Sequence, residues 1–434
     1  MAITIDNIRD NGITGAGGAS FPTHVKLQAT PEFIIVNAAE CEPLLHKDMQ
    51  ILELYAGVFL KGLEEIVNLT GAKSAIIGIK AKHKSVIKSL KAKVAGYVKV
   101  CELGDFYPAG DEVTLVYLTT GRVIQPGQLP ISQGCVVQNV ETIYNIGDNK
   151  PVVEKFFTVG GEVKKPRTLK VPIGVTYGQV LSHFEITARN YIIRDGGMMM
   201  GKVTTDLNTV VTKRTGGLII LPTDNNSAMT YERYEDKKNT VRSAKASCDQ
   251  CSFCTELCPR YLLGYPVRPE TAMRNTMFNT ADDPRVNIGN VYCCECNLCT
   301  MFSCPEGLDP RGATVGEKRA VMTAKVKWEG LPVKEHPMVN YRKVPTKKLM
   351  QRLGITKYKN VGPYEEIDFR PTAVRIPLAQ HIGAAAEAVV SQGQAVEKYE
   401  LIGQAKGNVS ANVHASMSGV VTAVNEKEIV IERR

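Results

Sequence analysis

Eight of the twelve cysteines fall into two short runs whose spacing suits the binding of iron–sulfur clusters. The first run reads Cys-x2-Cys-x2-Cys-x3-Cys-Pro and the second reads Cys-x2-Cys-x2-Cys-x4-Cys-Pro. Three thiolates separated by two residues can hold three irons of one cubane, and the fourth cysteine then reaches the other cubane of a two-cluster protein. In chain order the cysteines are Cys248, Cys251, Cys254, Cys258, Cys293, Cys296, Cys299 and Cys304.

This spacing predicts two 4Fe-4S clusters that exchange their fourth ligands, as in bacterial ferredoxins. One cluster is expected to bind Cys248, Cys251, Cys254 and Cys304. The other is expected to bind Cys293, Cys296, Cys299 and Cys258. Cys294 lies outside this register and is expected to be a bystander. Two four-cysteine zinc sites are the alternative, but zinc motifs usually pair cysteines two and two across a long gap.

The remaining composition indicates a multidomain globular protein. The chain has 434 residues, of which 44% are hydrophobic and 22% charged, and it has no apolar run of the roughly 18 residues that a membrane span needs. The first residues resemble no export signal, so we expect a cytoplasmic protein whose cysteines bind metal rather than form disulfides. The net charge of +9 falls to about +5 once cluster ligation is counted, so it does not indicate a nucleic-acid partner.

Strands that alternate with helices predict an α/β domain with a mostly parallel sheet at residues 1–150. Its ligand is expected at the carboxyl ends of the strands. The expected strands are 33–37, 74–80 and 97–103, and the expected helices are 46–69 and 81–94.

Changes in residue composition and pattern along the chain predict four further segments. Short strands with Gly and Pro turns predict a β-rich module at 151–224. The cysteine domain covers 225–330 and is expected to be helical and rich in loops, with a polar linker at 225–245. Basic residues and prolines predict a second linker at 331–371, and short β segments predict a compact β domain at 372–434.

Four motifs of the N-terminal domain have glycine, amide and carboxylate residues that could surround a cofactor. Glycines let a backbone approach a phosphate closely and present its N–H groups. The motifs cover residues 12–26, 36–43, 107–112 and 137–142. In this order they resemble the flavin-binding subunit of respiratory complex I and its relatives, the RnfC component of the Rnf electron-transport complex and the PduS-type cobalamin reductases. The resemblance implies a Rossmann-like domain that binds FMN and receives a hydride from NADH.

The same resemblance extends over nearly the whole chain. It implies a soluble-ligand-binding β-grasp module at 151–224, a helical two-cluster ferredoxin domain and a C-terminal barrel-sandwich module at 372–434. The barrel-sandwich module precedes the flavin loop in RnfC but comes last here, an order that resembles the PduS branch. Biotinyl and lipoyl carriers use the same fold, but the hairpin tip at 415–419 has no lysine, so a carrier role is rejected.

The resemblance also implies roles for individual residues. Lys26 and the glycine loop are expected at the FMN phosphate and ring edge. The residues expected at the isoalloxazine and ribityl chain are Asn37, Glu40, Asn139 and Thr142. The expected cofactor-binding residues are Gly15, Gly17, Gly18, Phe21, Lys26, Asn37, Glu40, Gly110, Asp111, Asn139 and Thr142. Phe21 is expected to stack on the adenine of NADH, and the expected catalytic residues Glu42 and Glu112 to contact its ribose.

Simpler roles remain open for several of these residues. Asn37 and Asn139 could cap the ends of strands, and acidic pairs are usually solvated. The chain also has Ala39 where the superfamily often has an acidic residue, and Cys41 where it has a glycine. The flavin pose and direct NADH binding therefore stay open.

Together these features predict an oxidoreductase that passes electrons from NADH through FMN and two 4Fe-4S clusters. A flavin accepts two electrons as a hydride and releases them singly, and a cubane accepts one at a time. The resemblance makes cobalamin the acceptor, for a B12-dependent diol dehydratase system, and suggests an adenosyltransferase, microcompartment shell proteins and a microcompartment location. The alternatives are an electron-transfer subunit of an Rnf-like complex and a non-catalytic cluster carrier.

Overall fold

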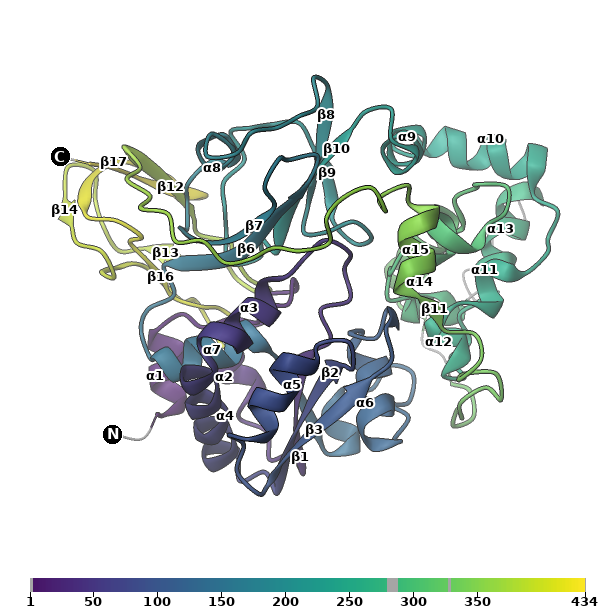
Figure 1. The fold of residues 1–434 in the computed structure, drawn as a ribbon, viewed down its shortest axis with the longest axis horizontal. Coiled ribbons are helices and arrows are strands. Elements are labelled where there is room, and N and C mark those ends of the chain that lie inside the picture. The colour runs from purple at the N-terminus through teal and green to yellow at the C-terminus, as the bar shows by residue number, and fades with distance from the viewer. Residues whose placement is uncertain (1–2, 279–287, 327–328, 434) are drawn as a thin grey trace.

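The computed structural model describes residues 3–278, 288–326 and 329–433. The other residues belong to the first, third and last predicted domains, and those parts of the predictions lie outside the described residues. Figure 1 shows the N-terminal domain below a second sheet, with the C-terminal β module on the left and the cysteine-rich region on the right. Among the helices described, none is both long and apolar enough to cross a membrane.

A four-stranded parallel sheet in the order β3-β2-β1-β5 forms the centre of the N-terminal domain. The strands are β1 (Phe33–Ala38), β2 (Ser74–Lys80), β3 (Val98–Leu103) and β5 (Cys135–Asn139), and the short β4 is Phe106–Tyr107. The helices are α1 (Ile5–Asp10), α2 (Thr23–Lys26), α3 (Lys47–Leu54), α4 (Ala56–Thr70), α5 (Lys84–Lys91), α6 (Glu112–Thr120), α7 (Val140–Asp148) and the 3-10 turn Pro130–Gln133. The predicted strands and their parallel order are confirmed, whereas the helix expected at 46–69 is two helices that meet at Tyr55.

The carboxyl ends of β1 and β5 bring two of the sequence motifs together. These strands are direct neighbours, and Asn37 pairs in register with Asn139. β1 is apolar along its length because helices cover both faces of a parallel sheet, so polar residues occur only where the strand ends. The sheet therefore places the amide side chains of two distant segments at one edge.

The second sheet is mixed and has five strands in the order β7-β6-β10-β8-β9. β6 pairs antiparallel with β7 and parallel with β10. Its elements are β6 (Glu154–Gly161), β7 (Arg167–Pro172), α8 (Tyr177–Leu181), β8 (Tyr191–Asp195), β9 (Lys202–Thr204) and β10 (Gly217–Pro222). The β-rich structure predicted for residues 151–224 is thus confirmed.

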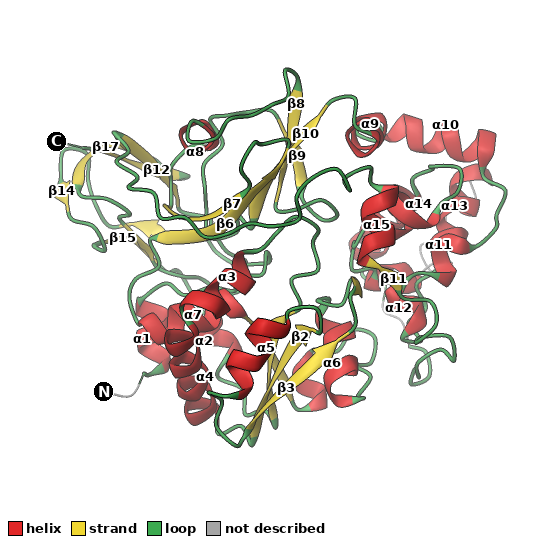
Figure 2. Cartoon of the chain, in the orientation of Figure 1, coloured by secondary structure: helices red, strands yellow, loops and turns green. Residues whose placement is uncertain are grey.

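The cysteine-rich region is helical, as Figure 2 shows. Its elements are α9 (Asn226–Arg233), α10 (Lys237–Ser247), α11 (Phe253–Glu256), α12 (Pro259–Leu262), α13 (Pro269–Phe278), the short helices Ile288–Tyr292 and Cys299–Ser303, and α14 (Pro310–Ala324). The linker predicted at 225–245 is wrong, because α9 and α10 occupy it. The buried face of α10 consists of Thr240 and Ala244, and such small residues leave no apolar period in the sequence.

The second predicted linker is also wrong, because part of it packs into the protein. β11 (Val344–Pro345) pairs with β4 of the N-terminal domain, and α15 (Thr346–Arg352) follows it directly. Val344 and Leu349 are buried, and Thr346 accepts a hydrogen bond from the buried Lys80 at 3.1 Å. This segment therefore joins the N-terminal domain to the cysteine-rich region.

Two small antiparallel sheets make up the C-terminal β module, in the orders β12-β18-β17-β14 and β13-β15-β16. Their strands are β12 (Ala373–Pro377), β13 (Glu387–Ala388), β14 (Ala395–Val396), β15 (Leu401–Gln404), β16 (Val413–His414), β17 (Gly419–Val424) and β18 (Glu428–Glu432). The buried apolar side chains of this module form one continuous core with those of the N-terminal domain and the mixed sheet. The last segment of the chain is therefore packed against the first.

Candidate flavin and iron–sulfur site

The glycine loop of residues 12–23 is held closed by its own backbone and by α7. Gly15 N–H donates to the Phe21 carbonyl at 2.9 Å, and Ala16 N–H donates to the Thr142 hydroxyl at 2.9 Å. Gly18 has φ of 113°, and a Cβ added there would meet no atom within 4 Å. The loop therefore leaves open space beside Gly18, at a backbone conformation that L residues rarely adopt.

Asn139 lies against this loop and uses both polar atoms of its side chain. A Cβ added to Gly17 would lie 3.5 Å from the Cβ of Asn139. The Asn139 Oδ1 caps α7 by accepting from Glu141 N–H at 3.0 Å, and its Nδ2 donates to Asp48 Oδ2 at 2.8 Å. Asn139, the last residue of β5, thus caps the helix that follows rather than the strand itself, at a position that also faces the loop.

Asn37 and Gly110 form a second contact at the carboxyl end of β1. The Nδ2 of Asn37 donates to the Gly110 carbonyl at 2.8 Å. A Cβ on Gly110 would lie 3.2 Å from both Asn37 Oδ1 and Cys41 Sγ, so only glycine fits without displacing them. Burial raises the pKa of Cys41 to about 11, which keeps this thiol neutral at pH 7.

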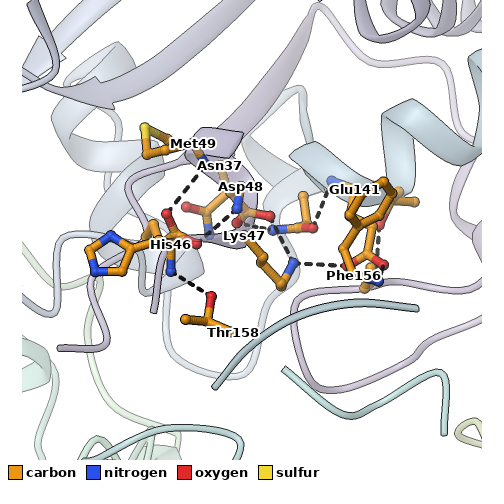
Figure 3. Close-up of polar contacts among 12 residues, drawn as sticks. Asn37, His46, Lys47, Asp48, Met49, Glu141, Phe156 and Thr158 are labelled. Carbon is orange, nitrogen blue, oxygen red and sulfur yellow. Dashed lines mark hydrogen bonds and ion pairs between the residues drawn. The ribbon is translucent and has the colours of Figure 1, made fainter. Parts of the chain in front are cut away.

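A buried network of charged residues supports the edge of the sheet, and Figure 3 shows most of its members. Lys47 Nζ lies 2.7 Å from Asp48 and 2.9 Å from Glu141, and Lys155 also pairs with Glu141. The Glu40 carboxylate accepts from Asp48 N–H at 2.8 Å at the start of α3. Because Asp48 also holds Asn139, the network joins two of the predicted flavin residues.

The pKa values of this network follow from its burial. Burial, and then the nearby Asp48, raise the pKa of Glu40 to about 8. Burial alone would raise the pKa of Glu141, but Lys155 and Lys47 hold it below its ordinary value. The sequence predicts no role for Lys47, Lys155, Asp48 or Glu141. The one feature of the sequence that points to any of them is the charged pair Lys47–Asp48 at the start of α3.

Replacement of Glu40 by glutamine should flatten the pH dependence of stability. A folded-state pKa of about 8, above the ordinary 4.5, means that the folded chain binds this proton more tightly than the unfolded chain. The free energy of unfolding should therefore fall as the pH rises from about 4.5 to about 8, and Glu40→Gln should remove that part of the fall. Urea unfolding at several pH values, with hydrogen exchange of the β1 amides, measures it. Glu53→Gln, at an exposed position of α3, is the control. Parallel pH curves for wild type and Glu40→Gln would contradict the prediction.

Replacement of Glu141 by glutamine should lower the free energy of unfolding by about 3–5 kcal/mol, because it leaves two buried lysines without their shared carboxylate. Chemical denaturation under anaerobic conditions measures the loss. Glu185→Gln is the matched control, since the Lys164–Glu185 pair is 62% exposed on both sides and should contribute about 0–1 kcal/mol. Equal losses in the two variants would show that burial of the network is unimportant.

Three predicted acidic residues have different surroundings. Glu112 pairs with Lys26 at 2.8 Å, and both side chains are partly exposed. Asp111 caps α6 and pairs with Arg260 of the cysteine-rich region at 2.7 Å. Glu42 accepts from the N–H groups of residues 199 and 200 at 2.8 and 3.0 Å. Glu42 thus ties the N-terminal domain to the mixed sheet, and its contact with NADH stays a prediction.

The cysteines form two groups that cross between the sequence runs. Four of them line one open cavity at the surface of the cysteine-rich region. These four are Cys248, Cys251, Cys254 and Cys304. The set is the first of the two predicted ligand sets, with its fourth member supplied by the second run. Cys251 is exposed, so the cavity reaches the surface.

The second group gathers around Cys258. Burial raises the pKa of Cys258, and the adjacent Cys293 thiol raises it further. Burial likewise raises the pKa of Cys299, with Cys293 and Cys258 as neighbours that add to it. Cys296 also lies beside Cys258 and Cys299. These proximities bring the second predicted ligand set together, and Cys294 also lies beside Cys258 and forms a side-chain hydrogen bond with Cys296.

The two cysteine loops share an unusual backbone conformation. Gln250 and Ser252 have φ of 58° and 66°, and Glu295 and Asn297 have φ of 57° and 65°. These residues lie two and four positions after the first cysteine of each run. Left-handed residues other than glycine are uncommon and cluster at functional sites. The equivalence makes Cys293 the counterpart of Cys248 and leaves Cys294 at the position of Asp249.

The group around Cys258 adjoins the N-terminal domain. The Tyr107 hydroxyl donates to the Cys296 carbonyl at 2.7 Å, and Cys294 lies beside Arg260, which pairs with Asp111. Asp111 follows Gly110, whose carbonyl accepts from Asn37. A short chain of contacts therefore connects the end of β1 with the second cysteine group, while the first group opens to solvent.

The chemistry of these donors fits the cofactors that the sequence predicts. Two sets of four thiols suit cubane ligation. A glycine loop with open space beside a left-handed residue suits an anionic phosphate. The residues present therefore fit one flavin phosphate and two clusters.

Three sequence families match separate parts of the chain. Residues 8–148 match the Nuo51 FMN-binding domain, residues 247–309 match the 4Fe-4S dicluster domain, and residues 355–433 match the RnfC barrel sandwich hybrid domain. The matches agree with the glycine loop, the paired cysteine groups and the two C-terminal sheets. Together, fold and site define a multidomain flavin and iron–sulfur oxidoreductase.

Similarity to individual proteins identifies the family within this class. The chain is 37% identical over 434 residues to a protein named cobalamin reductase PduS from Citrobacter freundii, covering 99% of this chain and 96% of the relative. It is equally similar, at 37% over 443 residues, to cobalamin reductase PduS of Salmonella typhimurium, with 100% and 98% covered. The chain therefore belongs to the PduS cobalamin reductase family.

More distant similarity involves a smaller part of the chain. A component of the proton-translocating ferredoxin:NAD(+) oxidoreductase complex of Clostridium ljungdahlii is 32% identical over 267 residues, which is 59% of this chain and 55% of that component. Among solved structures, an NAD+-reducing [NiFe]-hydrogenase in the H2-reduced state matches with a TM-score of 0.50 and 20% identity. The match covers 73% of this chain and 60% of the hydrogenase chain, so it indicates a shared fold and no more.

Proposed function

We propose that this protein passes electrons from NADH through FMN and two 4Fe-4S clusters to cobalamin. The similarity to proteins named cobalamin reductase, over essentially the full length of both chains, is the observation that carries the proposal. The glycine loop and the crossed cysteine groups support it, because flavin and cluster chemistry converts a two-electron donor into single-electron steps. Similarity to the Rnf-type component extends over 59% of the chain, which favours a cobalamin reductase over a member of a membrane complex.

The residues around the glycine loop would hold the flavin. Backbone N–H groups near Gly18 would bind the phosphate, with Asn139 and Thr142 beside them. Asn37 and Gly110 would lie along the isoalloxazine edge. The Lys26–Glu112 pair is partly exposed, so Glu112 would be free to accept from the ribose of NADH, and Phe21 would stack on its adenine.

The arrangement of the cysteine groups suggests the direction of transfer. The set around Cys258 contacts the N-terminal domain through Tyr107 and the Arg260–Asp111 pair. The set that contains Cys251 opens to solvent on the other side. We therefore assign the Cys258 set as the receiving site from the flavin domain and the Cys251 set as the outlet toward the acceptor.

The proposal also covers the identity of the mixed-sheet module, the boundaries of the modules and the partners of the protein. The β6–β10 sheet with α8 would be a soluble-ligand-binding β-grasp module, since a hairpin followed by a helix leads to a strand parallel to the first. The module boundaries would lie near 150, 224, 330 and 371, with the segment before the last boundary acting as a packed connector. An adenosyltransferase and microcompartment shell proteins would be partners in a cytoplasmic compartment.

Anaerobic reconstitution followed by an NADH-driven assay tests the proposal. We expect about eight irons and eight labile sulfides per chain, bound FMN, and reduction of cobalamin faster than reduction of ferredoxin. Faster reduction of ferredoxin, with recovery alongside membrane subunits, would favour the Rnf-like function. Intact clusters without NADH oxidation would favour a cluster carrier. Stoichiometric zinc without labile sulfide would exclude an iron–sulfur protein.

A further inference from the structure

A buried lysine joins the glycine loop to the C-terminal module. Lys213 follows the mixed sheet's β9, and its side chain is 3% exposed. Its Nζ donates to the Gly12 carbonyl at 2.6 Å and to the Asn412 carbonyl at 2.9 Å. Gly12 begins the glycine loop, whereas Asn412 precedes β16. One amino group therefore connects three parts of the chain that lie about two hundred residues apart.

The partners of Lys213 make this contact hard to replace. Within the described part of the chain its amino group contacts carbonyl oxygens rather than a carboxylate, so no ion pair competes for it. Gly12 has φ of 60°, and a Cβ added there would lie 2.3 Å from the Asn412 carbonyl oxygen. Removal of the amino group would leave two buried carbonyl oxygens facing each other without a donor.

The other arm of the glycine loop is held by the same C-terminal module. Ile382 N–H donates to the Ser20 carbonyl at 3.2 Å, and the Ser20 hydroxyl bonds to Thr14 at 2.8 Å. Asn412 Nδ2 also donates to the Asp10 carbonyl at 3.4 Å. Both ends of the loop are thus fixed by groups outside the N-terminal domain.

We propose that Lys213 is a positioning residue for the flavin phosphate, and that with residues 380–412 of the C-terminal module it holds the glycine loop in its phosphate-binding conformation. The proposal rests on the proposed FMN binding. The phosphate needs several backbone N–H groups aimed at one point, and a loop braced at both ends keeps them aimed. Loss of the brace should weaken recognition of the phosphate more than recognition of the isoalloxazine.

Comparison of FMN with riboflavin tests this directly, because riboflavin lacks the phosphate. We expect Lys213→Met, in the full chain with reconstituted clusters, to raise the FMN dissociation constant at least about tenfold, and the riboflavin constant less than about threefold. Fluorescence titration measures both constants, and iron content and melting temperature report on folding. A brace that served only stability would lower the melting temperature and leave the FMN-to-riboflavin preference unchanged, which would overturn the proposal.

Two further variants keep the test decisive. Lys398→Met removes another contact of the C-terminal module, with Glu154 at 2.9 Å, and should leave the flavin preference intact. Ile382→Pro removes the N–H that reaches Ser20, and decides the matter if Lys213→Met does not fold. A preference retained in Ile382→Pro would also count against the brace. Failure of the wild type to prefer FMN would overturn the proposed function instead, so the two failures are distinguishable.

Discussion

A protein in which Cys258 is replaced by alanine should keep about four of its expected eight irons, and the lost cluster should be the one held by the second cysteine run. Cys258 belongs to the first run in sequence, yet its thiol lies beside Cys293 and Cys296. The four cysteines that line the open cavity do not include it. Iron and sulfide analysis measures the loss, and EPR of the reduced protein shows which signal disappears.

Neighbouring cysteines provide matched controls for this experiment. Cys294→Ala should retain both clusters, because the backbone equivalence of the two loops places Cys294 outside the ligand set. Cys304→Ala should remove the other cluster, the one of the open cavity. Loss of the cavity cluster in Cys258→Ala would show that each run binds its own cluster without exchange.

Replacement of Gly18 by valine should weaken FMN binding by at least about tenfold to a hundredfold while leaving both clusters loaded. Gly18 has φ of 113°, which a β-branched residue adopts only at a cost of about 1–3 kcal/mol or more. The space beside it is open, so the effect comes from the backbone and from occupation of the anion's place rather than from a clash with protein atoms. Flavin content after purification and FMN titration of the apoprotein measure the effect.

Gly17→Ala is the matched control in the same loop. Gly17 does not have the left-handed conformation, and an added Cβ would make an ordinary 3.5 Å contact with Asn139. FMN binding should therefore change by less than about threefold. If Gly18→Val kept wild-type flavin content, the loop would be an ordinary turn, and the phosphate would have to bind elsewhere.

Several parts of this protein could be predicted because the signal is local in the sequence. The strand at 33–38 is a run of apolar residues that suits a buried parallel sheet, and its observed bounds agree with the prediction. The sequence does not predict helices α9 and α10. The buried residues of α10 are Thr240 and Ala244, and such small residues leave no apolar period in the sequence. Tertiary packing, not propensity, decides whether such a polar segment forms a helix.

The candidate site likewise has parts that the sequence predicts and parts that it does not. Cysteine spacing alone predicted the two ligand sets, since cubane geometry dictates which residue types must recur and how far apart. Four motifs similarly indicated a flavin loop. The contacts of Glu42 could not be predicted, because its partners, the backbone N–H groups of residues 199 and 200, are more than 150 residues away in the chain.

The sequence by itself determined which kinds of groups are available. These are eight cysteines in two runs, a glycine-rich loop and amides at the ends of strands. They can be recognised because the residues of each motif lie close together in the chain. Only the tertiary structure decided which distant groups meet. It joined Glu141 to Lys47 and Lys155, and set Lys213 between Gly12 and Asn412. Buried polar groups need partners wherever the fold supplies them, and sequence separation carries no record of that choice.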